Sequence, residues 1–372
     1  MTASTAQRMS TAPSPTGAAA RTSGAPTLTS PTETVLMTRT QPRSTAAPFD
    51  LTFGDRALAA ARRDLVLGRW RGARDLLRAT GGDWDHRTHR MRLLADCPTA
   101  IHAVESWRSA DPGDPDAVVL CAVIEVMRIF AIVAEANRSI GSPPATDDSL
   151  NRVHLDHAVR ICLQAAGRHP ADPVPWVCLL SLARLYGGGH PHVWRWWCEL
   201  LTRDPHNREA HHQLLRFLSA RWHGSNGEMF NFARDTAASA PPGSPLAVLT
   251  QAARAEHYRY RVATEGPTAL GLTWHWNHEV AVQELHTTMR RWVAQRGDVE
   301  HAQDVADLNL VLHGLVLAGL TDAAREVYSQ LGDRPTHSPW SCTGNPQRLF
   351  AHWREQLTAV GDQHSSAPAA AG

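Results

Sequence analysis

The sequence predicts an all-α protein, an α-solenoid of antiparallel helical hairpins with a disordered N-terminal tail. Apolar residues recur at spacings of three and four over most of 53–358, which is the period of amphipathic helices. No stretch shows sustained two-residue alternation, so we expect no sheet. Asp-Pro, Pro-Pro and glycine-rich segments interrupt the pattern repeatedly, as in chains of short helices joined by loops.

The two ends of the chain differ in composition from the part between them. Residues 1–52 are rich in Thr, Ser, Ala and Pro, and Glu33 is their only acid before Asp50. Such a segment cannot bury enough apolar surface to offset the entropy of ordering it. We therefore expect disordered tails at 1–52 and 359–372, with N-terminal helical pairs at 53–140 and a longer repeat array at 147–358.

In the N-terminal region the pattern predicts paired helices followed by one long helix. Gly68 stands between the first two, where glycine permits the tight turn that joins paired helices. The long helix contains the most apolar run of the chain, but Glu125 and Arg128 interrupt it one turn apart. Charges at the centre of a bilayer are costly, so we expect a buried helix and no membrane span. The expected helices are 55–67, 70–79, 83–95, 99–110 and 115–138.

In the array, prolines separate the helices at a regular distance. Pro170, Pro205 and Pro241 lie 35 and 36 residues apart, and each follows one helical segment and precedes another. Proline ends a helix because it lacks the backbone N–H that the helix needs. The expected helices are 147–168, 174–186, 191–202, 208–220, 227–239, 245–264, 274–295, 299–318, 321–331 and 346–357.

Two segments repeat the same arrangement at opposite ends of the helical region. Gly68 and Ala73 in 66–77 correspond to Gly319 and Ala324 in 317–328. A helix, a turn glycine, a second helix with a small residue at the crossing and a closing proline resemble the tetratricopeptide pattern, although no repeat carries its full signature. The resemblance implies a tetratricopeptide-like array.

A more particular resemblance lies in Arg-Trp-His-Gly-Ser-Asn-Gly-Glu-Met-Phe-Asn-Phe-Ala-Arg, residues 221–234. This segment is similar to one in an uncharacterised actinobacterial family of tetratricopeptide-like helical-repeat proteins. The similarity extends over about 176–340 and includes Asn309 and the Pro339-Trp340 pair. His223 stands where a glycine is more usual in that family. The resemblance implies a fold and no established activity.

Charge and composition exclude several classes of function. All 37 basic residues are arginine, so lysine-dependent P-loop ATPases, protein kinases, pyridoxal enzymes and lysine nucleophiles are excluded. The 37 arginines are balanced by 36 acidic residues, which argues against bulk binding of nucleic acid or anionic membranes. Six cysteines form no C-x-x-C pair, and the first residues contain no secretory apolar segment. We expect reduced thiols and a cytoplasmic protein.

The lysine-free composition, with 21 histidines, is typical of a GC-rich genome. The densest histidine segment is Trp-His-Trp-Asn-His-Glu at 274–279. If helical, His275 and His278 project one turn apart, and Glu256 and His257 on the preceding helix could face them. Two imidazoles and a carboxylate can bind one zinc, copper or iron ion. The alternative is a set of polar residues in a groove or core, and pairs such as His86/His89 and His154/His157 show that this spacing recurs.

Nucleophilic catalysis has no comparable pattern, because neither G-x-S-x-G nor H-E-x-x-H occurs. Ser225 followed three residues later by Glu228 predicts a helix N-cap with a capping box.

The sequence thus favours an interaction scaffold that binds a protein or peptide on a concave surface rich in Trp, His and Arg. The expected groove residues are Trp222, His223, Glu228, Trp274 and Trp276. The alternative function is an enzyme, or an auxiliary protein of a specialised biosynthetic pathway, with a metal or acid–base site at Glu256, His257, His275 and His278.

Overall fold

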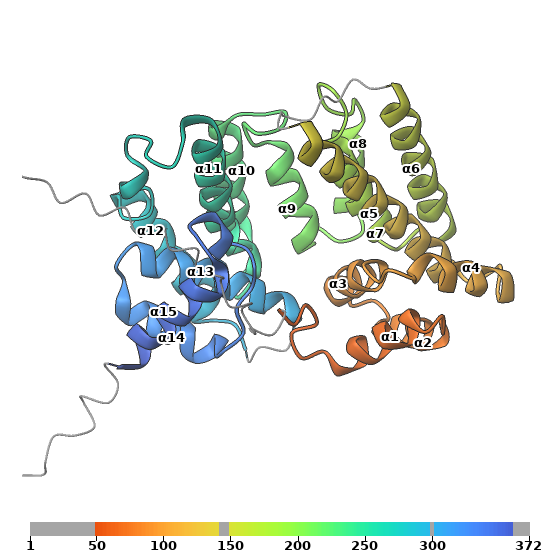
Figure 1. Ribbon diagram of the computed structural model, residues 1–372, viewed down its shortest axis with the longest axis horizontal. Coiled ribbons are helices and arrows are strands. Elements are labelled where there is room, and N and C mark those ends of the chain that lie inside the picture. Colours follow the sequence, from red (N-terminus) through yellow and green to blue (C-terminus); the bar gives the residue numbers. More distant parts are fainter. Residues whose placement is uncertain (1–48, 141–148, 298–300, 360–372) are drawn as a thin grey trace, which may run out of the picture. The chain divides into compact units, whose positions relative to one another are not determined.

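The computed structural model describes residues 49–140, 149–297 and 301–359, and over these residues the protein is all-α (Figure 1). Within them are fifteen α-helices and no strand. The helices are α1 Arg56–Val66, α2 Arg71–Thr80, α3 Trp84–Ala95, α4 Ala100–Ala110, α5 Pro115–Ile140, α6 Ser149–Arg168, α7 Val174–Ala183, α8 Val193–Leu201, α9 Arg208–Phe217, α10 Asn226–Ser239, α11 Leu249–Glu265, α12 Glu279–Thr288, α13 Ala302–Leu317, α14 Thr321–Leu331 and α15 Pro346–Ala359. Each coincides with one predicted segment, so the all-α prediction is confirmed.

The predicted N-terminal tail is too long at its C-terminal end. Residues 49–52 lead into a turn in which the Asp50 carboxylate accepts hydrogen bonds from the backbone N–H and the hydroxyl of Thr52, at 2.9 and 2.7 Å. Thr52 is buried. The described residues leave out 1–48, which is the rest of that tail, the first two residues of the predicted helix 147–168, and 360–372 of the predicted C-terminal tail.

The predicted helix 274–295 is wrong at its N-terminal end, because residues 275–278 are not helical. Leu272–Trp274 is a turn of 3₁₀-helix, α12 begins at Glu279, and Met289–Val293 closes the segment as a π-helical turn. His278 has extended backbone angles, φ −73° and ψ 155°, and stands at the N-cap position of α12, with its Nδ1 atom 3.4 Å from the Ala281 nitrogen. An N-cap residue stands outside the helix, so His275 and His278 do not share a helical face.

Helix α5 is the central element of the N-terminal half, and it contacts α3, α4, α6 and α7 (Figure 1). Its buried residues include Val119, Val123 and Val126, while Glu125 and Arg128 pair at 2.6 Å along its polar edge. Among the described residues this is the one helix, over 115–134, whose length and apolar composition would also suit a membrane span. About 44% of that apolar stretch is buried against the other helices, which is how a core helix is placed in a globular protein.

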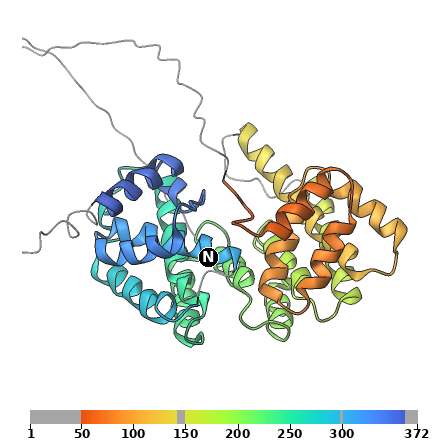
Figure 2. The same cartoon turned by 90° about the horizontal axis from the view of Figure 1, so that it is seen from below.

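Helices α13, α14 and α15 pack against one another at the C-terminal end (Figure 2, blue). Asn309, fully buried on α13, connects this group to the segment before α15. Its side-chain oxygen accepts from the Trp340 indole at 2.8 Å and from the Thr336 N–H at 3.3 Å. Its amide nitrogen donates to the carbonyls of Val305 and Arg334 at 2.7 and 3.0 Å. A buried amide with every polar group satisfied fixes the position of the chain around it.

Replacing Ser225 with alanine is expected to lower the free energy of unfolding by about 1 kcal/mol, the usual effect of losing an N-cap. The Ser225 hydroxyl accepts from the Glu228 N–H at 3.2 Å, so the predicted N-cap is present, while the Glu228 carboxylate accepts from the Ser225 hydroxyl at 2.8 Å and not from the backbone N–H as in a capping box. Urea unfolding measures the change. Ser329→Ala, an exposed position inside α14, is the control. Equal losses in the two variants would contradict the capping role.

Candidate binding cleft

Seven arginine, glutamate and aspartate side chains surround one cavity of about 340 Å³. Helices α3, α9, α11 and α13 each supply part of its wall, and the segment at 336–338 supplies another part. The charged and polar residues of this wall are His89, Arg92, Arg208, Glu209, His212, Arg216, Glu256, Arg259, Gln303 and Asp307. We call this cavity the arginine cleft.

One buried arginine joins three of these elements. Arg208, the first residue of α9, is placed by its N-cap Asn207, whose side chain accepts from the Ala210 N–H at 3.0 Å. Its guanidinium pairs with Asp304 and Asp307 of α13 at 2.8 and 2.9 Å, and with Asp85 of α3 at 2.9 Å. The guanidinium is only 6% exposed, so its charge is neutralised by protein groups and is not offered to a ligand.

The three carboxylates around Arg208 do not share its charge equally. Burial raises the pKa of Asp307 to about 7, although Arg208 opposes this change. Burial also raises the pKa of Asp85, again against the effect of Arg208. Arg208 and Arg296, which also pairs with Asp304 at 3.2 Å, are two guanidinium groups for three carboxylates, so Asp307, the most buried of the three, holds a proton over part of the neutral range.

Two further carboxylates are shared among four arginines. Glu209 lies 3.6 Å from Arg92 and 3.7 Å from Arg216. Glu256 lies 3.9 Å from Arg221 and 3.5 Å from Arg259. These distances exceed those of charge-assisted hydrogen bonds, which are about 2.7–2.9 Å. The four guanidinium groups therefore keep hydrogen-bond donors for another acceptor.

Exposure makes these four arginines different from Arg208. Their side chains are between 37 and 55% exposed, whereas the two glutamates are 8 to 9% exposed. Burial disfavours the charge of Glu209, but Arg92 and Arg216 outweigh this and lower its pKa to about 2. The two glutamates lie beneath the four guanidinium groups. Four arginines against two glutamates leave two surplus positive charges at this surface. Such a surface attracts carboxylates and phosphates.

Two of the three histidines that line the arginine cleft, His89 and His212, are neutral at pH 7. Burial lowers the pKa of His89 and of His212 to about 3 in each case. The His89 Nε2 atom is buried without a hydrogen-bond partner. Neither imidazole can act as a general acid near neutral pH, because proton donation needs a pKa close to the working pH.

The five residues predicted to form a partner groove do not come together. None of Trp222, His223, Glu228, Trp274 and Trp276 lines the arginine cleft. Trp276 is 5% exposed and packs on Tyr258 and His313 with ring centroids 4.6 and 5.1 Å away, so it belongs to the core. Trp274 is 67% exposed. The Glu228 carboxylate accepts a hydrogen bond from the Ser225 hydroxyl at the start of α10.

Trp222 and His223 instead lie against Arg184. The Trp222 ring stacks on its guanidinium at 5.1 Å, and His223 Nε2 donates to its carbonyl at 2.8 Å. The backbone comes close to another segment one residue later, at Gly224. A Cβ atom on Gly224 would lie 2.2 Å from the carbonyl oxygen of Leu218.

The predicted metal ligands are also not assembled into a site. Arg254 lies among them, where its guanidinium donates to His278 Nε2 at 2.9 Å and its carbonyl accepts from His275 Nε2 at 2.9 Å. Glu256 faces the arginine cleft, and the His257 ring lies 5.3 Å from that of His275. A guanidinium cation in this position repels a metal ion. In the part of the chain that the structure describes, no three His, Cys, Asp or Glu side chains group as a metal site.

Of the residues that line the arginine cleft, the sequence analysis predicted only Glu256 as a site residue. Glu209 and Arg216 lie seven residues apart on one helix, and Glu256 and Arg259 lie three apart on another. These spacings place each pair on one helical face. Among 37 arginines, however, nothing in a single sequence marks which faces meet.

No protein-family model matches this chain, and no curated protein or solved structure matches it either. The functional inference therefore depends on the chain's own residues.

Proposed function

We propose that this protein is a helical interaction scaffold that binds an acidic, extended segment of a partner protein in the arginine cleft. The observation that carries the proposal is the set of half-exposed arginines, Arg92, Arg216, Arg221 and Arg259, above two buried glutamates. Arginine forms paired hydrogen bonds with carboxylates and is enriched in protein interfaces.

The proposal includes the finer architecture expected from sequence, an α-solenoid of tetratricopeptide-like hairpins. Consecutive helices contact one another in the pairs α1–α2, α5–α6, α10–α11 and α13–α14, which supports such an array. Solenoids present extended surfaces that suit peptide ligands. The resemblance of 221–234 to actinobacterial helical-repeat proteins supports the same assignment.

A cytoplasmic location is part of the same proposal. All six cysteines are free thiols, and Cys97, Cys162 and Cys178 are buried. Free buried thiols suit a reducing compartment. The alternative function is a metal-dependent or acid–base enzyme. Its predicted residues, Glu256, His257, His275 and His278, are not brought together in the described residues as the arginines of the cleft are.

Changing Arg92, Arg216 and Arg259 together to glutamine is expected to weaken binding of an acidic peptide by at least about tenfold, because charge pairs at an interface contribute this much or more. The probe is a fluorescein-labelled ten-residue peptide with six glutamates, and its affinity for the full chain is measured by anisotropy. The same peptide with glutamine for glutamate should bind the unaltered protein at least about tenfold more weakly.

The matched control changes three exposed arginines outside the cleft, Arg63, Arg195 and Arg290, to glutamine. It removes the same net charge, so it separates a local site from general electrostatic attraction. The proposal is wrong if both triple variants lose affinity equally, or if the unaltered protein does not prefer the glutamate peptide.

A further inference from the structure

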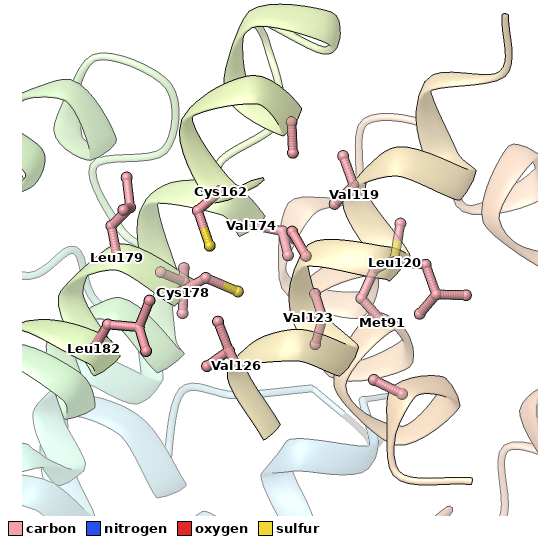
Figure 3. Close-up of a cluster of buried hydrophobic side chains, with 14 of the residues drawn as sticks. Met91, Val119, Leu120, Val123, Val126, Cys162, Val174, Cys178, Leu179 and Leu182 are labelled. Carbon is pink, nitrogen blue, oxygen red and sulfur yellow. The ribbon is translucent and has the colours of Figure 1, made fainter. Parts of the chain in front are cut away.

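A second cavity, of about 270 Å³, lies between α3, α5, α7 and α9 and is mostly apolar. We call it the apolar pocket. Figure 3 shows Val123 and Val126 of α5 and Cys178 of α7 on the facing sides of these two helices. Met127 and Phe130 extend the α5 side, where both are only partly buried. A well-formed apolar cavity with few polar groups is the usual form of a small-molecule site.

Four charged residues line this pocket, Arg92, Arg184, Glu209 and Arg216, and Arg184, which is 8% exposed, is the one among them without an ion pair. It follows the last residue of α7, and its guanidinium stacks between the rings of Phe130 and Trp222, with centroids 5.3 and 5.1 Å away. Its side-chain hydrogen bond to protein runs from Nε to the Ser181 carbonyl, at 3.4 Å. Among the described residues, no carboxylate lies within ion-pair distance of it.

The surroundings of Arg184 leave its charge uncompensated. Burial lowers the pKa of Arg184 to about 9, and Arg216 contributes in the same direction, while Glu209 opposes them. The guanidinium still carries its charge at pH 7. Glu209 is already shared by Arg92 and Arg216 in the arginine cleft. A buried charge without a partner is costly, and a bound anion would remove that cost.

We propose that the apolar pocket binds a small monocarboxylate with an apolar body, whose carboxylate pairs with Arg184. The two aromatic rings hold the faces of the guanidinium and leave its Nη edge for paired hydrogen bonds to a carboxylate. The hydrocarbon part lies among Val123, Val126 and Val177. The apolar pocket shares Arg92, Glu209 and Arg216 with the arginine cleft, but Arg184 does not line the cleft, so a change at Arg184 tests this site separately from the proposed scaffold function.

The test measures binding of octanoate and 4-phenylbutyrate to the full chain by calorimetry and by the shift in melting temperature. Both acids are expected to bind saturably and to raise the melting temperature. Octan-1-ol and octylammonium have a similar apolar body without the negative charge, and are expected to bind at least about tenfold more weakly. Equal stabilisation by octanoate and octanol would overturn the role of Arg184.

Arg184→Gln removes the charge and keeps a shorter, uncharged polar side chain. It is expected to weaken octanoate binding by at least about tenfold. Without ligand its melting temperature should equal or exceed that of the unaltered protein, because an unpaired buried charge has been removed. The matched control is Arg195→Gln on α8, an exposed position where neither quantity should change.

Val126→Phe tests the pocket without altering Arg184. The larger ring fills the cavity, so octanoate binding should be lost although the guanidinium remains. If this variant does not fold, the octanoate affinity of Arg184→Gln still tests whether the pocket binds the acid through Arg184. The proposal is overturned if neither acid binds the unaltered protein, or if Arg184→Gln binds octanoate with unchanged affinity.

Discussion

Replacing Arg208 with methionine is expected to lower the free energy of unfolding by about 3–5 kcal/mol or more, the usual effect of removing one partner from a buried ion pair. Methionine keeps much of the volume but leaves Asp85, Asp304 and Asp307 without their shared cation. Because these carboxylates come from α3 and α13, the variant should weaken the attachment of both helices to α9. Urea unfolding followed by circular dichroism measures the loss.

Two further variants make this result specific. Arg325→Met removes an arginine from a pair whose partner, Asp322, is 99% exposed, so a change of at most about 1 kcal/mol is expected. Adding Asp307→Asn to Arg208→Met should recover part of the lost stability, because one of the three buried carboxylates is removed. Similar losses in the Arg208 and Arg325 variants would show that the buried cluster does not stabilise the fold.

Mild acid is expected to unfold the protein, with a midpoint near pH 5. Burial lowers the pKa of four histidines, His89, His212, His301 and His313, to about 3 in each case. In the unfolded chain a histidine takes up its proton near its ordinary pKa of about 6.5. Below that pH the unfolded chain therefore binds protons that the folded chain does not, and stability falls as the pH falls.

The size of this effect follows from the pKa difference. Each such histidine contributes about 2 kcal/mol less stability at pH 5 than at pH 7, since one pH unit corresponds to about 1.4 kcal/mol. Four of them together approach the whole stability of a typical domain, about 5–15 kcal/mol. The histidine contribution is fully present above pH 6.5 and is lost progressively toward pH 3.

Asp307 acts in the opposite direction. Its pKa is raised to about 7, so between about pH 4 and 7 the folded chain holds a proton that the unfolded chain releases. Its contribution is complete below the unfolded pKa and is lost as the pH rises through 7. Burial also raises the pKa of Asp85 and Asp204, but it lowers the pKa of three more histidines, His190, His211 and His275, to about 4, so the net change on acidification remains destabilising.

The measurement is a titration from pH 8 to pH 3 followed by helical circular dichroism and tryptophan fluorescence. His313→Gln keeps a partner for the Thr343 hydroxyl, 3.1 Å from His313 Nε2, and removes one titrating group. It should move the midpoint to lower pH. His102→Gln, where the side chain is 80% exposed, should not move it. Persistence of the native fold at pH 4 by both probes would contradict this prediction.

The positions of most helices were predictable from the sequence. The segment at 274–295 is the exception, because its helix begins five residues later than predicted. Its apolar spacing continues across His278, so periodicity alone joins the two sides. The helix α12 begins only after His278, which stands at its N-cap. The His278 ring is held there by Arg254, which lies 24 residues away in the chain. A contact of that kind leaves no mark in the local pattern.

The same limit applied to the candidate sites. Sequence reasoning placed ligands at His275 and His278, which are noticeable because tryptophans flank them. In the structure these imidazoles hydrogen-bond to Arg254, and the exposed charge lies elsewhere, on arginines that look ordinary in the sequence. Residue type was a poor guide because 37 arginines are available and burial distinguishes among them.

By itself, then, the sequence determined the helical period, the proline and glycine breaks, the Ser225 cap and the exclusion of lysine chemistry. These features depend on neighbours within a few residues, and local sequence specifies such neighbours directly. The tertiary structure alone decided that Arg208 is neutralised, that the arginines of the cleft share two glutamates, and that Arg184 is buried beside an apolar pocket. Whether an arginine is paired, shared or unpaired depends on which helices pack together. Helix packing is determined by the burial of apolar and charged groups over the whole chain.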